Sequence, residues 1–395
     1  MISIIIVIFT FHAFCSAQIL PKEAYATVPK LISSAGYPVN KYRVETTDGY
    51  ILQIFRIPAG RRTSRRTDNA KGKKAVLLVH GLMGSSDNFI IMGPNKSLGY
   101  MLADAGYDVW LGNLRGTIYS AHQNLTRNDA QFWKFSFHEH GKYDVPAMID
   151  KILSITRLNK ILYVGHSMGT TSFFVMMSEK PEYNEKIVAF IGLAPAVYVG
   201  TMKPLVQVLL KDLELSNMMR TQGIYTSDLT KNQWGILAAT TCMVKNPEIN
   251  LCVRGTSMIM GEDNEQVDMD MLPVWIARIQ PGSWQQFEHF AKIAYTDVFT
   301  TLEGGMNGSI KPYNLTNVKV PVTLLYGEND QLAHKSQVLK LAEELKSNGV
   351  LEEVRPACSC PKFNHVDFIF AKNISTLVNQ PLIKVINKLY NKYGS

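Results

Sequence analysis

The stretch Ile161-Leu-Tyr-Val-Gly-His-Ser-Met-Gly169 joins a short apolar run to a Gly-x-Ser-x-Gly motif, and a helix-forming segment follows it. In this strand–turn–helix context the motif predicts a nucleophile elbow, a sharp turn that lifts a serine hydroxyl above the edge of a sheet. Glycines flank the serine because larger side chains would clash in so tight a turn. The stretch therefore predicts an α/β sheet that carries Ser167 as a nucleophile.

Short apolar runs and amphipathic segments alternate along the rest of the chain. A hairpin is expected at 42–57, around Asp48-Gly49. The other expected strands lie at 75–79, 108–112, 161–164, 187–193, 322–326 and 351–354. The expected helices lie at 142–157, 334–348 and 381–393. This alternation predicts an α/β fold with a mostly parallel central sheet covered by helices on both faces.

Strand-like runs are largely missing between about residues 198 and 314, where methionine and aromatic residues become frequent. They include Met202, Met218, Met219, Trp234, Met258, Met260, Met269, Met271 and Trp275. We expect a helical cap or lid at 197–312, inserted into a core of residues 18–196 and 313–395. Methionine is apolar and adaptable, so such a cap suits flexible acyl chains, although part of it is ordinary helical core.

A serine hydroxyl becomes a good nucleophile only when a base takes its proton and a third group orients that base. In a fold built around such an elbow, an acid and then a histidine follow the serine along the chain. Asp330 follows the apolar run at 322–326, and His365 lies in a loop after the next helix and strand. We therefore expect a catalytic triad of Ser167, Asp330 and His365, with Glu328 as the competing acid.

The remaining histidines of the mature chain lack the features expected of the base. Inside the elbow, His166 is expected to pack and to form hydrogen bonds rather than to act as a base. Polar or helical contexts without a partner in the required order surround His122, His138, His140, His289 and His334.

The tetrahedral intermediate of such a reaction needs hydrogen-bond donors for its oxyanion. We expect these donors to be the backbone N–H groups of Met168 and of Leu82, the latter in the loop His80-Gly-Leu-Met-Gly84. Backbone donors leave the side chains free to vary, and a purely structural role for this glycine-rich loop is the alternative. The sequence contains neither a cluster with metal-ligand spacing nor a phosphate-binding glycine loop, so no metal and no cofactor are expected.

Residues 1–17 are mostly apolar and end in small residues at a cleavage position, which is typical of a secretory signal peptide. A membrane anchor is the alternative, but the run is too short to span a bilayer core of about 30 Å, and no later segment looks transmembrane. Asn-x-Ser/Thr sequons for N-glycosylation begin at Asn95, Asn124, Asn307, Asn314 and Asn373. The sequence therefore predicts a glycoprotein that is secreted or reaches the lysosomal lumen.

The cysteines that follow residue 17 are even in number, which favours disulfides in an exported protein. A bridge between Cys242 and Cys252 would close a short loop. Cys358 and Cys360 are harder to assign, because a loop that tight strains a bridge. These two are free, bridged to each other or paired elsewhere.

Most of the formal net charge of +8 lies in one stretch. Residues 60–75 contain Arg61, Arg62, Arg65, Arg66, Lys71, Lys73 and Lys74, against Asp68 alone. Such a stretch is a solvated loop or a contact for anionic lipid or glycan surfaces. Nucleic acid is not an expected partner, because no nucleic-acid-binding motif accompanies the charge.

Several longer motifs are ordered along nearly the whole mature chain. They read Gly36-Tyr-Pro38, Thr47-Asp-Gly-Tyr-Ile-Leu52, His80-Gly-Leu-Met-Gly-Ser-Ser-Asp-Asn88, Asn113-Leu-Arg-Gly116, Phe132-Trp133 with Phe135-Ser-Phe137, Lys142-Tyr-Asp144, Pro146-Ala147 and Asn364-His-Val-Asp-Phe368. These motifs resemble those of the acid lipase family, which includes gastric lipase and lysosomal acid lipase. The more divergent cap is similar to that of insect-type members.

The resemblance implies an α/β-hydrolase core, a helical cap with a mobile lid, and hydrolysis of triacylglycerols or cholesteryl esters. The site residues that it implies are the triad Ser167, Asp330 and His365, the oxyanion donors Leu82 and Met168, and a disulfide between Cys242 and Cys252. Two departures from the family pattern bear on the site. Met168 stands where vertebrate members carry Gln, and an unusual Cys-x-Cys segment at 355–361 is expected to bear on the position of His365.

The expected function is therefore hydrolysis of a lipid carboxylic ester, with a lipid droplet or membrane surface as an expected partner. A small soluble ester is the alternative substrate. A non-catalytic lipid-binding or storage protein on the same fold is the alternative function.

Overall fold

The computed structural model describes residues 20–61, 73–202, 204, 218–219, 221–227 and 239–394. The expected signal peptide at 1–17 lies outside these residues. Most of the basic stretch and several parts of the expected cap, residues 203, 205–217, 220 and 228–238, lie outside them as well.

A nine-stranded mixed sheet forms the centre of the described molecule. Its strands are β1 (Asn40–Glu45), β2 (Tyr50–Ile57), β3 (Ala75–Val79), β4 (Asp108–Leu111), β5 (Ser120–His122), β6 (Ile161–His166), β7 (Ile187–Leu193), β8 (Val322–Tyr326) and β9 (Leu351–Pro356). The order across the sheet is β1-β2-β4-β3-β6-β7-β8-β9, with β5 paired to β2. The pairs from β4 to β9 are parallel, and those that involve β1, β2 and β5 are antiparallel. The expected fold class is thereby confirmed.

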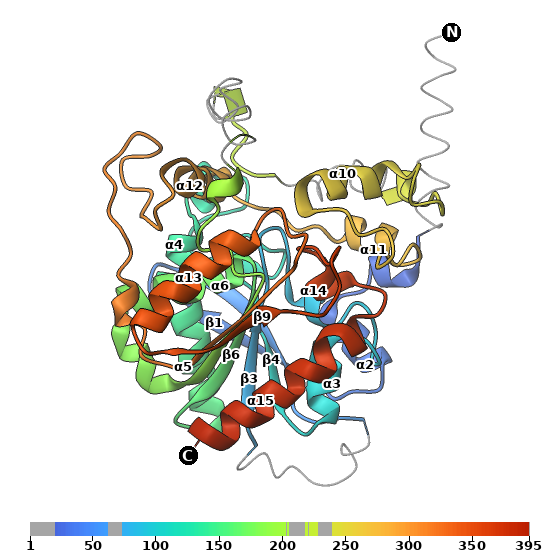
Figure 1. Ribbon diagram of the computed structural model, residues 1–395, viewed down its shortest axis with the longest axis horizontal. Coiled ribbons are helices and arrows are strands. Elements are labelled where there is room, and N and C mark those ends of the chain that lie inside the picture. Colours follow the sequence, from blue (N-terminus) through green and yellow to red (C-terminus); the bar gives the residue numbers. More distant parts are fainter. Residues whose placement is uncertain are drawn as a thin grey trace.

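Helices cover both faces of this sheet. The described helices are α2 (Val28–Ser34), α3 (Leu98–Asp104), α4 (Phe137–Glu139), α5 (Val145–Thr156), α6 (Met168–Glu179), α10 (Leu251–Met260), α11 (Leu272–Ala277), α12 (Trp284–Thr296), α13 (Lys335–Ser347), α14 (Asp367–Phe370) and α15 (Gln380–Tyr393). Figure 1 shows α3 and α15 on one side of the strands and α5 and α6 on the other. Because both faces are covered, β3, β6 and β7 are buried along their whole length.

The described part of the expected cap is mainly helical. In the chain, α10, α11 and α12 lie between β7 and β8, and Figure 1 shows them beyond one end of the strands. The Asn250 side chain accepts N–H bonds at the start of α10, and Ser283 forms a capping box with Gln286 at the start of α12. These caps satisfy N–H groups that a helix leaves unpaired at its first turn. Each of these two helices therefore begins at a residue that the sequence specifies locally.

Three of the sequence motifs meet in one buried ion-pair cluster around Arg115. Its guanidinium lies 2.6 Å from the carboxylate of Asp48 and 2.7 Å from that of Asp144. The same group stacks over the ring of Tyr50, with its central carbon 3.9 Å from the ring centroid. Arg115 is buried, and Asp144 is completely so. The cluster ties the β1–β2 hairpin to the loop after β4 and to the residue that precedes α5.

Replacing Arg115 with methionine should lower the free energy of unfolding by about 3–5 kcal/mol, because two carboxylates would lose their buried counter-charge. Chemical denaturation of the variant and the wild type measures this difference. Lys245→Met is the matched control, since Lys245 pairs with Asp270 on the open surface, where an ion pair contributes little. Equal losses in the two variants would contradict a stabilising role for the buried cluster.

Candidate active site

Ser167 lies in a sharp turn between β6 and α6, with φ at 52° and ψ at −122°. A side chain rarely adopts this backbone conformation, so the surrounding chain must impose it. The flanking glycines make the turn possible: a Cβ at Gly165 would lie 2.8 Å from the Gly169 carbonyl carbon. A Cβ at Gly169 would lie 2.4 Å from the carbonyl oxygen of Val79 on the neighbouring strand. The predicted strand–turn–helix is therefore present. Its two glycines, Gly165 and Gly169, are needed for the tight turn and for the close packing of α6 on β3.

The structure brings the three expected side chains together at the carboxyl ends of the strands. The Nε2 atom of His365 lies 2.8 Å from the Oγ atom of Ser167. On the other side of the ring, Nδ1 lies 2.8 Å from the Oδ2 atom of Asp330. All three side chains are buried, and Asp330 is completely so. Among the described residues, no other histidine ring forms a hydrogen bond with Ser167 or Asp330.

The contacts of Asp330 differ from those of Glu328, the competing acid. Asp330 accepts backbone N–H bonds from Leu332 at 2.9 Å and from Ala333 at 2.8 Å through Oδ1, which leaves Oδ2 for the histidine. Glu328 instead forms an ion pair with Lys335 at 2.9 Å, near the surface. The order of residues along the chain is compatible with either acid as the partner of His365. In the structure it is Asp330 that contacts the His365 ring.

The glycine-rich loop after β3 lies directly against Ser167. A Cβ at Gly81 would lie 2.8 Å from the Cβ of Ser167, so only glycine fits here without a shift. The N–H groups of Leu82 and Met168 have no acceptor among the described residues. Met168 is the first residue of α6, where a helix offers its own N–H groups no partner. Both expected donors are therefore free to bind an oxyanion beside Ser167.

Residues from the expected cap hold this loop, and sequence reasoning missed them. The N–H of Gln280 donates to the carbonyl of Met83 at 2.9 Å, and Met83 itself has φ at 56°. Arg278 pairs with Asp87 of the same loop at 2.5 Å, and both side chains are buried. Their separation of 191 residues gives no local pattern from which the contact could be read.

The side chain of Met168 contacts the cap as well. The amide nitrogen of Gln286, on α12, lies 3.3 Å from the Met168 sulfur. The Met168 side chain therefore forms a contact between the elbow and the expected cap. The backbone N–H of Met168 does not depend on the side chain.

Two further histidines, His80 and His166, are buried near Ser167. His80 accepts a hydrogen bond from the N–H of Leu114 at Nε2, so its Nδ1 carries the proton and donates to the carbonyl of Gly81 at 2.8 Å. The Nε2 atom of His166 lies 3.1 Å from the carbonyl oxygen of His365. Burial lowers the pKa of His80 to about 4 and, together with the nearby His365, that of His166 to about 3. Both rings are therefore neutral near pH 7 and act as fixed hydrogen-bonding groups.

The segment at 355–361 precedes His365, whose ring contacts both Ser167 and Asp330 in the structure. The structure places Cys358 and Cys360 together as a pair, which is one of the three alternatives left open by the sequence. Cys242 is joined to Cys252, as expected. All five sequon asparagines are exposed, namely Asn95, Asn124, Asn307, Asn314 and Asn373.

Comparisons with known proteins agree with this arrangement. Residues 28–93 match a family described as a partial alpha/beta-hydrolase lipase region, and residues 74–228 match the alpha/beta hydrolase fold. Lipase 3 of Drosophila melanogaster is 38% identical over 89% of this chain and 91% of its own. Gastric triacylglycerol lipase of Bos taurus is 34% identical over 95% of both chains, and human lipase member K is 33% identical over 91% of this chain and 90% of its own.

Solved structures support the fold at much lower sequence identity. A provisionally assigned lipase from Sulfolobus solfataricus has a TM-score of 0.58 at 15% identity, covering 89% of this chain and 94% of its own. At that identity the likeness speaks for the architecture alone.

Replacing Gly81 with alanine should lower kcat for a soluble ester by roughly 10²-fold, since the new Cβ would push the loop and its Leu82 donor away from Ser167. Steady-state kinetics measures this loss, and a thermal melt shows whether the variant is folded. Gly255→Ala is the control, because a Cβ there meets open space. A folded Gly81→Ala enzyme with wild-type kcat would show that the loop does not need to approach the serine.

Proposed function

Because this chain belongs to the acid lipase family and is a carboxylic ester hydrolase, we propose that Ser167, His365 and Asp330 are its catalytic triad. The observation that carries the proposal is the pair of 2.8 Å contacts from the two ring nitrogens of His365 to the serine and to the aspartate. In a triad, such contacts let the ring accept the serine proton while the carboxylate fixes the tautomer.

The proposed reaction proceeds through an acyl-enzyme. His365 takes the proton of Ser167 as Oγ attacks the ester carbonyl, and the N–H groups of Leu82 and Met168 bind the oxyanion. His365 then passes the proton to the leaving alcohol, and the ester bond breaks. In the second half, His365 deprotonates water, and the resulting hydroxide attacks the acyl carbonyl. The protonated His365 then returns its proton to Oγ of Ser167 as the acyl-enzyme ester bond breaks and a carboxylic acid leaves. No metal or other cofactor takes part in these steps.

We propose neutral lipid esters, triacylglycerols or cholesteryl esters, as the substrates. The printed name of the bovine relative, gastric triacylglycerol lipase, supports a triacylglycerol. The methionine-rich segment at 197–312 supports long acyl chains, and we propose that it caps a core of residues 18–196 and 313–395. Small soluble esters are the alternative substrate class, and a profile of activity against acyl-chain length separates the two.

A lipid droplet or membrane surface is the proposed site of action. Large apolar side chains are exposed on and beside α10, with Met258 86%, Leu251 69% and Ile249 64% exposed. Exposed apolar groups gathered on one element are typical of a docking surface. No helix in the described part of the chain could cross a bilayer.

The proposed location is extracellular or lysosomal. The apolar sequence at 1–17, the disulfides and the exposed sequon asparagines support export through the secretory pathway. We propose N-linked glycans at these asparagines.

Ser167→Ala should lower turnover of a p-nitrophenyl ester by about 10⁴-fold or more and abolish labelling by a fluorophosphonate probe. Ser172→Ala, in the same helix, is the matched control, since the Ser172 hydroxyl only donates to the carbonyl of Met168. A Ser167→Ala enzyme that keeps even a tenth of wild-type turnover would overturn the proposed triad. Loss of labelling in both variants would point to misfolding of α6 instead.

Leu251→Asp and Met258→Asp should each lower the hydrolysis of emulsified triacylglycerol by about tenfold, because a charge on this face opposes contact with an apolar surface. The same variants should hydrolyse a soluble short-chain ester at a rate close to that of the wild type. Lys372→Asp, an exposed change on the core, is the control. Equal losses on both substrates would argue against a role of α10 at the lipid surface.

A further inference from the structure

Residues 260–263, the bracket segment, connect the two loops that carry the acid and the base of the proposed triad. The carbonyl of Met260 accepts hydrogen bonds from the N–H of Gln331 at 3.3 Å and from the N–H of His365 at 3.4 Å. The carbonyl of Gly261 accepts one from the side chain of Asn364 at 2.8 Å. The bracket segment therefore lies across both loops at the end of α10.

The fit of this segment is tight. Gly261 has φ at 101°, and a Cβ there would lie 1.9 Å from the carbonyl oxygen of Asn329. The Asn329 side chain in turn donates to the carbonyl of Glu262 at 2.9 Å. Any movement of the bracket segment would therefore disturb the backbone beside Asp330.

Asp263 and Asp367 both line the pocket where the bracket segment meets the loop of His365, and their carboxyl groups lie within hydrogen-bonding reach of each other. Asp263 ends the bracket segment, and Asp367, the first residue of α14, lies two positions after His365. Both are buried, with 3% and 4% of their surface exposed. Asp367 accepts the N–H of Asn364 at 2.7 Å through Oδ2. The Oδ1 atom of Asp263 is buried and has no donor among the described residues.

A pair of buried carboxylates needs either a cation or a shared proton. Across the described ranges, neither Asp263 nor Asp367 forms an ion pair, and no group of residues that could hold a metal ion is found. A proton on one carboxyl would give the other a hydrogen bond and remove the like-charge repulsion.

We propose that Asp263 and Asp367 share one proton, and that this pair is a positioning contact that holds the bracket segment against the loops of Asp330 and His365. The inference rests on the proposed triad, since it concerns the position of the proposed base. Neither carboxyl touches the reacting atoms, so both act through the loop that carries His365.

The electrostatic surroundings favour retention of this proton. Burial raises the pKa of Asp367 to about 8, and the charges of Asp263 and Asp330 act in the same direction. Burial also raises the pKa of Asp263, to which Glu265 adds. The protonated Asp263–Asp367 pair therefore stabilises the folded protein fully below the usual carboxyl pKa of about 3.9. This stabilisation is lost as the pH rises through about 8, the pKa of Asp367 in the folded protein.

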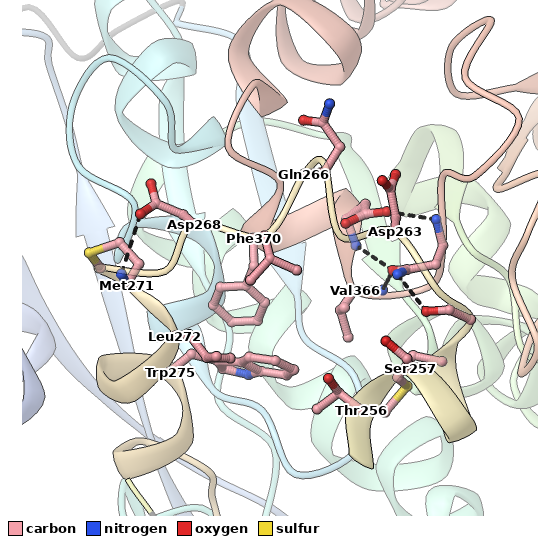
Figure 2. A pocket seen from close by; sticks show the side chains of 15 residues that line it. Thr256, Ser257, Asp263, Gln266, Asp268, Met271, Leu272, Trp275, Val366 and Phe370 are labelled. Atoms are coloured by element: carbon pink, nitrogen blue, oxygen red, sulfur yellow. Dashed lines mark hydrogen bonds between the residues drawn. The ribbon is translucent and has the colours of Figure 1, made fainter. Parts of the chain in front are cut away.

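The remaining charged groups around the pair are already engaged. Glu265 pairs with Lys362 at 3.7 Å, and Asp268, at the other end of the same pocket, pairs with Lys96 at 2.9 Å. Figure 2 shows Asp263 at one side of this pocket, beside Val366, with Trp275 and Phe370 at its apolar side. Because these walls are apolar, little water can hydrate the two carboxylates, and a second negative charge there would be costly.

Asp263→Asn tests the shared proton, because the amide keeps the shape of the side chain and donates to Asp367 at every pH. Thermal unfolding is followed from about pH 5 to about pH 9 for the wild type, Asp263→Asn, Asp367→Asn and the exposed control Asp270→Asn. Across this range the melting temperature of each pair variant should gain about 3 °C or more relative to the wild type. The control should follow the wild type throughout.

Activity on a soluble ester gives the positioning readout. Toward alkaline pH, kcat of the wild type should fall while KM stays nearly constant, and Asp263→Asn should keep its kcat. Melting curves that remain parallel for the wild type and both pair variants would overturn the shared proton. Melting temperature does not depend on turnover, so this failure is distinct from a failure of the Ser167→Ala test.

Discussion

The backbone of Ser167 is the constraint on which the rest of the site depends. Its φ of 52° costs about 1–3 kcal/mol, and the turn persists because β6 and α6 fix both of its ends. The close approach of Gly169 to the carbonyl of Val79 sets how near α6 lies to β3. The same approach brings Gly81, at the end of β3, against Ser167. One packing contact therefore positions both Ser167, the proposed nucleophile, and the loop of Leu82, a proposed oxyanion donor.

Local sequence patterns were enough to predict the strands and the turn that this packing contact joins. Apolar runs located the hairpin and the parallel strands, and the elbow motif located the turn, because each depends on residues close together in the chain. The order of acid and histidine narrowed the third side chain to Asp330 or Glu328. The choice between them needed a contact 35 residues away, from Asp330 to His365, and the surface pairing of Glu328 with Lys335.

The contacts between cap and core were not predictable in this way. Helical periodicity shows which face of α10 is apolar, but it does not show that the carbonyl of Met260 reaches the N–H of His365. Nor does it pair Arg278 with Asp87. Both contacts join the expected cap to loops of the candidate site, so the segment that we propose as a cap also supports the loops around Ser167 and His365.

Backbone hydrogen bonds also hold the turn that precedes His365. After β9 the N–H of Ala357 donates to the carbonyl of Tyr326, and the N–H of Asn329 donates to the carbonyl of Phe363. The chain is thus tied to the acid loop on both sides of the bridged pair at 358 and 360, which lies in the turn between these ties. The position of His365 is set by these ties and by Met260, so the composition of the turn does not reach the imidazole.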